Sequence, residues 1–246
     1  MAEVQFDFSG KNFLVTGASS GMGREIASEI AASGGTVLAV ARNAERLSEL
    51  QAQYPDQIVT GVVPDICDDS AVQAVVDDFV AKHGKLSGLI HAAGILLFTP
   101  LKAYDESEAK KMMDISFWSS SALVRLLQKK KYSVDGASFV LFSSVSGISG
   151  EPGMFAYSAT KAAIRNLVRS LAPEIAHRGL RINAICPGLG RTPMTDGPVN
   201  PDVVKRHLLG EGEPADVAGV ALFMLSDRAR WMTGTDVVVD GGYLAN

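Results

Sequence analysis

Short apolar runs alternate with longer segments of helical periodicity along almost the whole chain. The apolar runs predict strands at Asn12–Thr16, Thr36–Val40, Ile58–Val62, Leu86–Ala92, Ser138–Ser143, Arg181–Cys186 and Asp236–Asp240. The helical patterns predict helices at Gly21–Ser33, Asn43–Gln51, Asp69–His83, Asp105–Lys130, Ala156–His177 and Pro214–Leu225. Most strand candidates are continuous Val, Ile, Leu and Phe, as in strands that are covered on both faces. The alternation therefore predicts an α/β fold: a doubly wound, seven-stranded parallel sheet with helices on both faces.

The longest irregular stretch is 187–200, which is rich in Gly, Pro and Thr and predicts a mobile loop. Asn200 followed by Pro201 indicates a short helix, because Asn caps helices and Pro suits their first turn. No repeat, low-complexity tract or linker interrupts the chain. We therefore expect residues 1–246 to form one domain.

The composition narrows the class of protein. The chain has 246 residues, of which 47% are hydrophobic and 20% charged, and its net charge is −4. This balance argues against nucleic acid or an anionic membrane as a partner. Its two cysteines, Cys67 and Cys186, have no metal-binding spacing, so no metal is expected. No run is long enough to span a membrane, and Glu3 and Asp7 stand where a signal peptide would be basic, so we expect a cytoplasmic protein.

A glycine-rich turn follows the first predicted strand and opens the first helix. It contains Gly17, Gly21 and Gly23, with Ser19, Ser20 and Met22 as further candidate contacts. Glycines let the backbone approach a pyrophosphate, whose charge suits the helix N-terminus. The spacing differs from the usual dinucleotide fingerprint, and such a turn can be purely structural. Its position between the first strand and its helix favours phosphate binding.

Arg42 and Asn43 come at the end of the second strand, where NAD-binding folds carry an acidic residue for the ribose hydroxyls. An arginine there accepts the 2′-phosphate of NADP instead. A solvated surface arginine is the alternative. We expect NADP(H) to be the cofactor rather than NAD.

Two further strand ends carry candidate cofactor contacts. Asp65 could accept a hydrogen bond from the adenine amino group while Ile66 packs on the ring, although Asp65 could equally cap the next helix. Ala92, Ala93 and Gly94 are small and leave room for a ribose and nicotinamide.

Tyr157 and Lys161 lie one helical turn apart and therefore share a face. A lysine ammonium beside a tyrosine favours the phenolate and lowers the pKa of the phenol. Ser144 ends the fifth strand, from which its hydroxyl could bind a substrate carbonyl in the same cleft.

These parts together resemble the short-chain dehydrogenase/reductase family, a single-domain Rossmann fold. The resemblance rests on TGASSGMG at 16–23, Asp65, HAAG at 91–94, Ser144, YSATK at 157–161, CPGLGRT at 186–192 and VDGG at 239–242. It implies that Ser144 polarises the substrate oxygen, Tyr157 is the general acid or base, and Lys161 holds the nicotinamide ribose and lowers the pKa of Tyr157.

The resemblance also implies that Pro187, Gly188 and Thr192 line the nicotinamide side. Substrate choice in this family resides in the following loop and short helix, here about 188–212. That segment is apolar with basic residues at its rim, among them Arg191 and Arg206.

Two positions depart from the family pattern. Ser116 stands where the family carries an Asn that supports a water in the proton relay, so its contribution to catalysis is open. His91 is the first residue of HAAG, where the family usually has NNAG. Its position in an apolar strand predicts a hydrogen-bonded core histidine rather than a catalyst.

The first functional hypothesis is an NADPH-dependent reductase of a small-molecule ketone or 3-oxoacyl substrate, similar to 3-oxoacyl-carrier-protein reductases. The second is a dehydrogenase that oxidises a sugar, steroid or polyol, and the third is a redox-inactive dinucleotide sensor or partner subunit. Lys129, Lys130 and Lys131 could contact a carrier protein or be a solvated helix end. Members of the family commonly form homotetramers through the two long helices and the last strand; we expect a homotetramer here, with a dimer as the alternative.

Overall fold

The computed structural model describes residues 5–196 and 201–246. Its strands are β1 (Asn12–Thr16), β2 (Thr36–Ala41), β3 (Ile58–Val62), β4 (Leu86–His91), β5 (Ser133–Phe142), β6 (Arg181–Pro187) and β7 (Asp236–Val239). They form one parallel sheet in the order β3-β2-β1-β4-β5-β6-β7. The predicted doubly wound, seven-stranded Rossmann sheet is confirmed.

The observed strands agree closely with the predicted ones, and the main difference is at β5. This strand begins at Ser133 rather than Ser138, because Ser133 pairs with Leu86 across an irregularity in the ladder. Gly136, with φ at +82°, lies in this irregular stretch. The sequence of this first part of β5 is largely polar and contains no apolar run from which a strand could be predicted.

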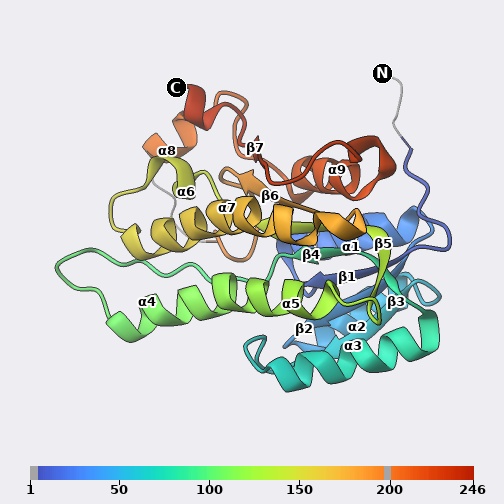
Figure 1. Cartoon of the computed structure of the whole chain (residues 1–246). Helices are drawn as coiled ribbons and strands as arrows, with labels where there is room; N and C mark the ends of the chain where they lie inside the picture. The colour runs from blue at the N-terminus through green and yellow to red at the C-terminus, as the bar shows by residue number, and fades with distance from the viewer. Residues whose placement is uncertain (1–4, 197–200) are drawn as a thin grey trace.

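The helices are α1 (Gly21–Ala32), α2 (Ala44–Gln53), α3 (Asp69–His83), α4 (Glu106–Met113), α5 (Ser119–Leu127), α6 (Ser146–Ser149), α7 (Phe155–Ile175), α8 (Pro201–Lys205) and α9 (Pro214–Leu225). Figure 1 shows α5 and α7 running alongside one another over one face of the sheet. No helix within the described residues has the length and hydropathy to cross a membrane. The predicted helix at Pro201 is present, whereas its proposed cap Asn200 lies outside the described residues.

Two buried apolar clusters fill the space on the two sides of the sheet. Leu14 belongs to the cluster under α3, α5 and α7, whereas its neighbours Phe13 and Val15 belong to the cluster under α1, α2 and α9. Alternate residues of a strand point to opposite faces, so helices cover both sides as predicted.

The predicted helix Asp105–Lys130 is interrupted, which corrects the sequence prediction. One turn of π-helix, Asp114–Trp118, separates α4 from α5. The hydroxyls of Ser119, Ser120 and Ser121 donate to backbone carbonyls one turn earlier, at the π-turn itself. Such back-bonding disturbs helical geometry, and π-turns occur often at functional sites.

His91 is a buried core residue, as predicted. Its Nδ1 lies 2.8 Å from Thr16 Oγ1 and its Nε2 lies 3.0 Å from Ser119 Oγ. Because Ser119 donates to the Ile115 carbonyl, it accepts from the ring, which assigns the neutral Nε2–H tautomer. Burial, followed by the positive charge of Lys161, lowers the pKa of His91 from 6.5 to about 3.

This pKa shift predicts loss of stability in mild acid. Below pH 6.5 His91 is protonated in the unfolded chain, whereas in the folded chain it stays neutral until the pH approaches about 3. The free energy of unfolding therefore decreases as the pH falls through this range. The slope from this group approaches about 1.4 kcal/mol per pH unit. We expect His91→Asn to have a shallower slope than the wild type in urea unfolding between about pH 6.5 and about pH 5, above the carboxylate range.

The exposed His83, which stacks on Phe79, provides a matched control. His83→Asn should keep the wild-type slope. Parallel slopes for the wild type and His91→Asn would contradict the prediction.

Candidate active site

The carboxyl ends of β1 and β4 form the point at which the strand order reverses, where open α/β sheets bind ligands. A cleft of about 1280 Å³ opens there. This volume exceeds that of an ordinary small-molecule pocket and accommodates a dinucleotide with a substrate. The predicted residues that line it are Gly17, Ser19, Ser20, Gly21, Met22, Gly23, Arg42, Asn43, Asp65, Ile66, Ala92, Ala93, Gly94, Ser144, Tyr157, Lys161, Pro187, Gly188 and Thr192.

The glycine-rich turn has the close contacts that a phosphate-binding loop requires. Gly17 has φ +72°, and a Cβ there would lie 2.8 Å from the backbone of Ala92 and Ala93. A Cβ on Gly23 would lie 2.5 Å from the carbonyl oxygen of Gly17. The side chain of Ser20, the N-cap of α1, makes no capping hydrogen bond, so the first N–H groups of α1 remain open to an anion. This cradle fits the pyrophosphate of a dinucleotide.

The glycine-rich turn lies in the half of the cleft that we assign to the cofactor. In the same half, Arg42 and Asn43 follow β2 and are exposed at the cleft. Asn43 caps α2 by accepting from the Arg46 N–H at 2.9 Å. Arg46 also lines the cleft, which sequence reasoning missed. The available signal was the place of Arg46 in the first turn of the helix that follows Arg42.

Asp65 and Ile66 also line this half of the cleft. Asp65 accepts from the Cys67 N–H at 2.9 Å, whereas the N-cap of α3 is Asp68. The alternative role of Asp65 as the helix cap is therefore wrong.

Ser144, Tyr157 and Lys161 meet above the carboxyl end of β5. Ser144 Oγ accepts from the Ser146 N–H at 3.1 Å, and its hydroxyl hydrogen bonds to Tyr157. Lys161 Nζ lies 5.5 Å from the centre of the Tyr157 ring and donates to the Phe142 carbonyl at 2.9 Å. Tyr157 is thus adjacent to both Ser144 and Lys161, and all three residues line the cleft.

The pKa of Tyr157 shifts in the direction opposite to the sequence-based expectation. Burial raises it to about 12, and the hydrogen bond from Ser144 opposes this shift only in part. Burial also lowers the pKa of Lys161 from 10.5 to about 8. Removal of both groups from water therefore outweighs the favourable effect of the ammonium on the phenolate.

Ser116 lies in the π-turn, buried, and does not line the cleft surface. Its Oγ has no hydrogen-bond partner among the described residues. A Cβ built on Gly94 would lie 3.4 Å from this Oγ and 3.6 Å from Lys161 Nζ, so both groups flank the same glycine.

The substrate half of the cleft contains residues that sequence reasoning did not assign to the site. Glu151 follows α6, Arg206 follows α8, and Tyr243 lies in the C-terminal turn. The short helix α6 itself was not predicted. Of these three residues, Arg206 alone lies in the segment that was predicted to select the substrate. No pattern in the sequence indicated Glu151 or Tyr243.

The doubly wound sheet with its glycine-lined crevice defines the class of dinucleotide-binding Rossmann proteins. A family model described as "Enoyl-(Acyl carrier protein) reductase" matches residues 17–244. The chain belongs to the short-chain dehydrogenase/reductase family, whose members are oxidoreductases that act on CH–OH or carbonyl groups and use NAD(P).

Relatives of known activity cover nearly the whole chain. Meso-2,3-butanediol dehydrogenase of Serratia marcescens is 32% identical over 248 residues, covering 97% of this chain and 96% of that protein. A 3-oxoacyl-(acyl-carrier-protein) reductase of Thermotoga maritima is 32% identical over 239 residues, covering 95% and 97%. A solved short-chain type dehydrogenase/reductase from Mycobacterium ulcerans has a TM-score of 0.91 at 28% identity, covering 98% of this chain and 92% of that one.

The close contacts of Gly23 predict a measurable cost for a methyl group. Gly23→Ala places Cβ against the Gly17 carbonyl, so we expect the free energy of unfolding to fall by about 1–3 kcal/mol and dinucleotide affinity to fall with it. Urea unfolding and calorimetric titration with NADPH measure the two effects.

Gly219 in α9 is a matched control, because a Cβ there meets nothing within 4 Å. Gly219→Ala should stabilise by about 0.5–1 kcal/mol through helix propensity and leave cofactor affinity unchanged. Equal effects of the two substitutions would contradict the assignment of Gly23 to the cradle.

Proposed function

We propose that this protein is an NADP(H)-dependent oxidoreductase that reduces the carbonyl of a ketone or 3-oxoacyl substrate to an alcohol. The observation that carries the proposal is the contact of Ser144, Tyr157 and Lys161 in the cleft that the glycine-rich turn also lines. The cofactor supplies a hydride to the substrate carbonyl carbon when bound. The protein supplies orientation and the proton.

In the proposed mechanism the hydroxyl of Ser144 donates to the substrate carbonyl oxygen. Its oxygen accepts from the Ser146 N–H, and its hydrogen, which bonds to Tyr157 in the structure, can rotate to the substrate oxygen when substrate binds. Tyr157 then gives its phenolic proton to the same oxygen. A pKa of about 12 keeps this phenol protonated at neutral pH, as a proton donor must be.

Lys161 stabilises the negative charge that develops on Tyr157. The Phe142 carbonyl holds its ammonium group, and the Ser143 hydroxyl donates to the Lys161 carbonyl at 2.7 Å. We propose that Ser116 binds a water beside Lys161 that returns the proton to the site. Its unpartnered hydroxyl across Gly94 supports this role, although serine replaces the family's Asn.

For the cofactor, we propose that Arg42 binds the 2′-phosphate of NADP, with Arg46 as a second cation. Pro187, Gly188 and Thr192 would line the nicotinamide side. Thr192 suits this role because its side chain lies over the phosphate turn, 3.2 Å from a Cβ built on Gly21.

We further propose that residues 1–246 form one domain whose segment 188–212 selects the substrate. The substrate is a small molecule, and a carrier-linked form is the second possibility. Lys131 of the basic run forms an ion pair with Asp77 of α3, which supports a structural role for that residue.

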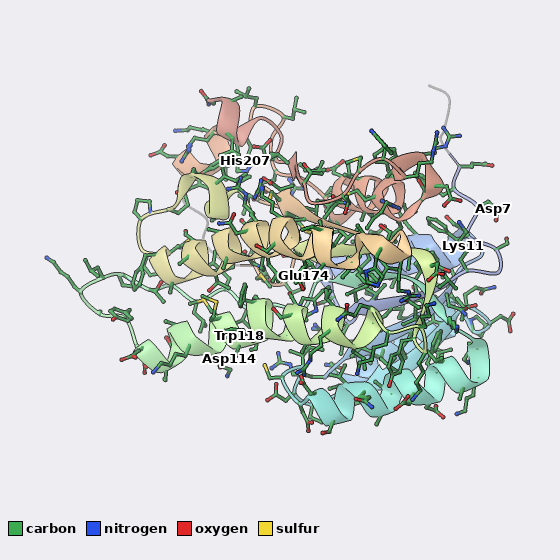
Figure 2. The ribbon with its side chains drawn as sticks, viewed as in Figure 1. Asp7, Lys11, Asp114, Trp118, Glu174 and His207 are labelled. Carbon is green, nitrogen blue, oxygen red and sulfur yellow. The ribbon has the colours of Figure 1, made fainter. Side chains whose placement is uncertain are left out.

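We propose that the protein is a homotetramer. Exposed apolar side chains on the expected interface elements support this: Trp118, which ends the π-turn before α5 and is labelled in Figure 2, and Val238 on the edge strand β7. Trp231, before β7, is almost fully exposed.

The proton donor is tested by Tyr157→Phe, followed as NADPH consumption over a panel of ketones. We expect kcat to fall by at least about 100-fold, with NADPH affinity retained. In the wild type, reduction should slow as pH rises through about 8, where Lys161 loses its charge. Tyr54→Phe, outside the cleft, is the control; a Tyr157→Phe enzyme with wild-type turnover would eliminate the assigned donor.

Cofactor preference is tested by Arg42→Asp. Loss of charge-assisted hydrogen bonds and the added carboxylate should lower the NADPH-to-NADH ratio of kcat/KM by about 10–100-fold. The exposed Arg230, substituted in the same way, should leave the ratio unchanged. A wild type that binds NADH more tightly than NADPH would refute the assignment.

A further inference from the structure

The substrate half of the cleft is mainly apolar but ends in a polar cluster that the proposed chemistry does not use. Leu96, Phe98, Met154, Met194 and Val203 line the apolar part. The polar cluster consists of Glu151, Arg206 and Tyr243, which also line the cleft. One turn of helix, α6, separates Ser144 from Glu151, so the cluster lies within reach of a substrate held at Ser144.

The three side chains hold one another in place. The Tyr243 hydroxyl donates to Glu151 Oε1, and Arg206 Nη1 lies 3.4 Å from the same oxygen. The Arg206 guanidinium stacks 3.9 Å over the Tyr243 ring. The side chain of Glu151 is 16% exposed and that of Arg206 is 40% exposed, so the cluster is fixed yet accessible.

His207 supports this cluster from behind. It stacks on Tyr243 with ring centres 4.6 Å apart, accepts from the Leu189 N–H at 2.9 Å and donates to the Val203 carbonyl at 2.9 Å. These two hydrogen bonds fix the orientation of the His207 ring behind Tyr243. Figure 2 shows it beside α8 and the C-terminal segment, at the end of the molecule where α6 lies.

The open hydrogen-bonding capacity of the cluster defines what it can bind. Both recorded contacts of Glu151 use Oε1, and within the described residues Oε2 has no hydrogen-bond partner. Arg206 uses one long contact to Glu151 and keeps other N–H donors. An acceptor beside a donor suits a hydroxyl group, which both donates and accepts.

The charges argue against an anionic group at this end. A ligand carboxylate would meet the Glu151 carboxylate at hydrogen-bond distance. The other charged side chains of this half, among the described residues and besides Lys161, are Lys111 and Asp202, one of each sign. Asp202 pairs with Lys205 at 3.2 Å. Together with Lys161, Arg206 and Glu151, the side chains of Lys111 and Asp202 make three cations and two anions, so the positive excess is a single charge and the Glu151 carboxylate stands at the ligand itself.

We propose that Glu151, Arg206 and Tyr243 form a specificity subsite that binds a hydroxyl group at the far end of an uncharged, largely apolar ketone. Glu151 accepts from this hydroxyl and Arg206 donates to it. The inference rests on the proposed carbonyl reduction and adds to it the substrate class: hydroxyketones, with carboxylate-ended ketones excluded.

The test uses a homologous series of linear methyl ketones whose far end carries a methyl, a hydroxymethyl or a carboxylate group. At one chain length the hydroxyl-ended ketone should exceed the methyl-ended one in kcat/KM by about tenfold, through KM rather than kcat. The carboxylate-ended ketone should be the poorest of the three at every length.

Glu151→Gln keeps an acceptor for Tyr243 but removes the charge. We expect it to raise kcat/KM for the carboxylate-ended ketone by about tenfold relative to the methyl-ended one. Glu49→Gln is the matched control, because Glu49 pairs with Arg24 outside the cleft. If Glu151→Gln does not fold, Arg206→Gln serves, and it should abolish the hydroxyl preference.

The two proposals fail in different ways. Turnover of the methyl-ended ketone with no preference for the hydroxyl overturns the subsite and leaves the reductase intact. If no ketone reacts, the proposal of carbonyl reduction is rejected. The subsite is then tested by calorimetric titration of the NADP-loaded protein with the three ketones. Equal affinities would overturn the subsite, and tighter binding of the hydroxyl-ended ketone would support it.

Discussion

The placement of one buried ammonium group governs the geometry of this site. Lys161 is 5% exposed, so its ammonium group requires a fixed hydrogen-bond acceptor within the protein. The Phe142 carbonyl at the end of β5 provides that acceptor, at 2.9 Å. This bond joins α7 to the carboxyl end of β5 and places Tyr157, one turn earlier in α7, next to Ser144.

Parallel topology brings the remaining parts to the same edge. All strands end on one side, so the turn after β1, the small residues after β4 and Ser144 after β5 face a common cleft. Arg165 of α7 reinforces the arrangement by donating to Asp236 of β7 at 2.9 Å and to the Gly147 carbonyl of α6 at 3.0 Å. The helix that carries the proton donor is thus held at both the sheet and α6.

Local patterns allowed most of the fold and the cofactor half to be predicted. The glycines after β1 and the Tyr157–Lys161 pair each lie within one turn or one helix, where spacing has direct geometric meaning. Glu151 and Tyr243 could not be predicted in this way, because they come from separate segments that no periodicity relates. The direction of the Tyr157 pKa shift was wrong for a related reason: burial depends on the complete fold, whereas a neighbouring lysine is visible in the sequence.

The two departures from the family pattern meet at the π-turn. His91 reaches from β4 to Ser119, whose hydroxyl donates to the Ile115 carbonyl, and Ser116 is the next residue. At the other end of the ring, Thr16 Oγ1 donates to His91 Nδ1 and accepts from the Ala93 N–H at 3.4 Å. One hydrogen-bonded chain therefore links the strand ends beside the proposed nicotinamide site to the turn that carries Ser116. Because Thr16, His91 and Ser119 are buried, a shift at position 91 moves the backbone that seats Ser116 beside Gly94 and Lys161. The residues at 91 and 116 are thus structurally coupled, and the effect of serine at 116 on proton transfer depends on the histidine that fixes the turn around it.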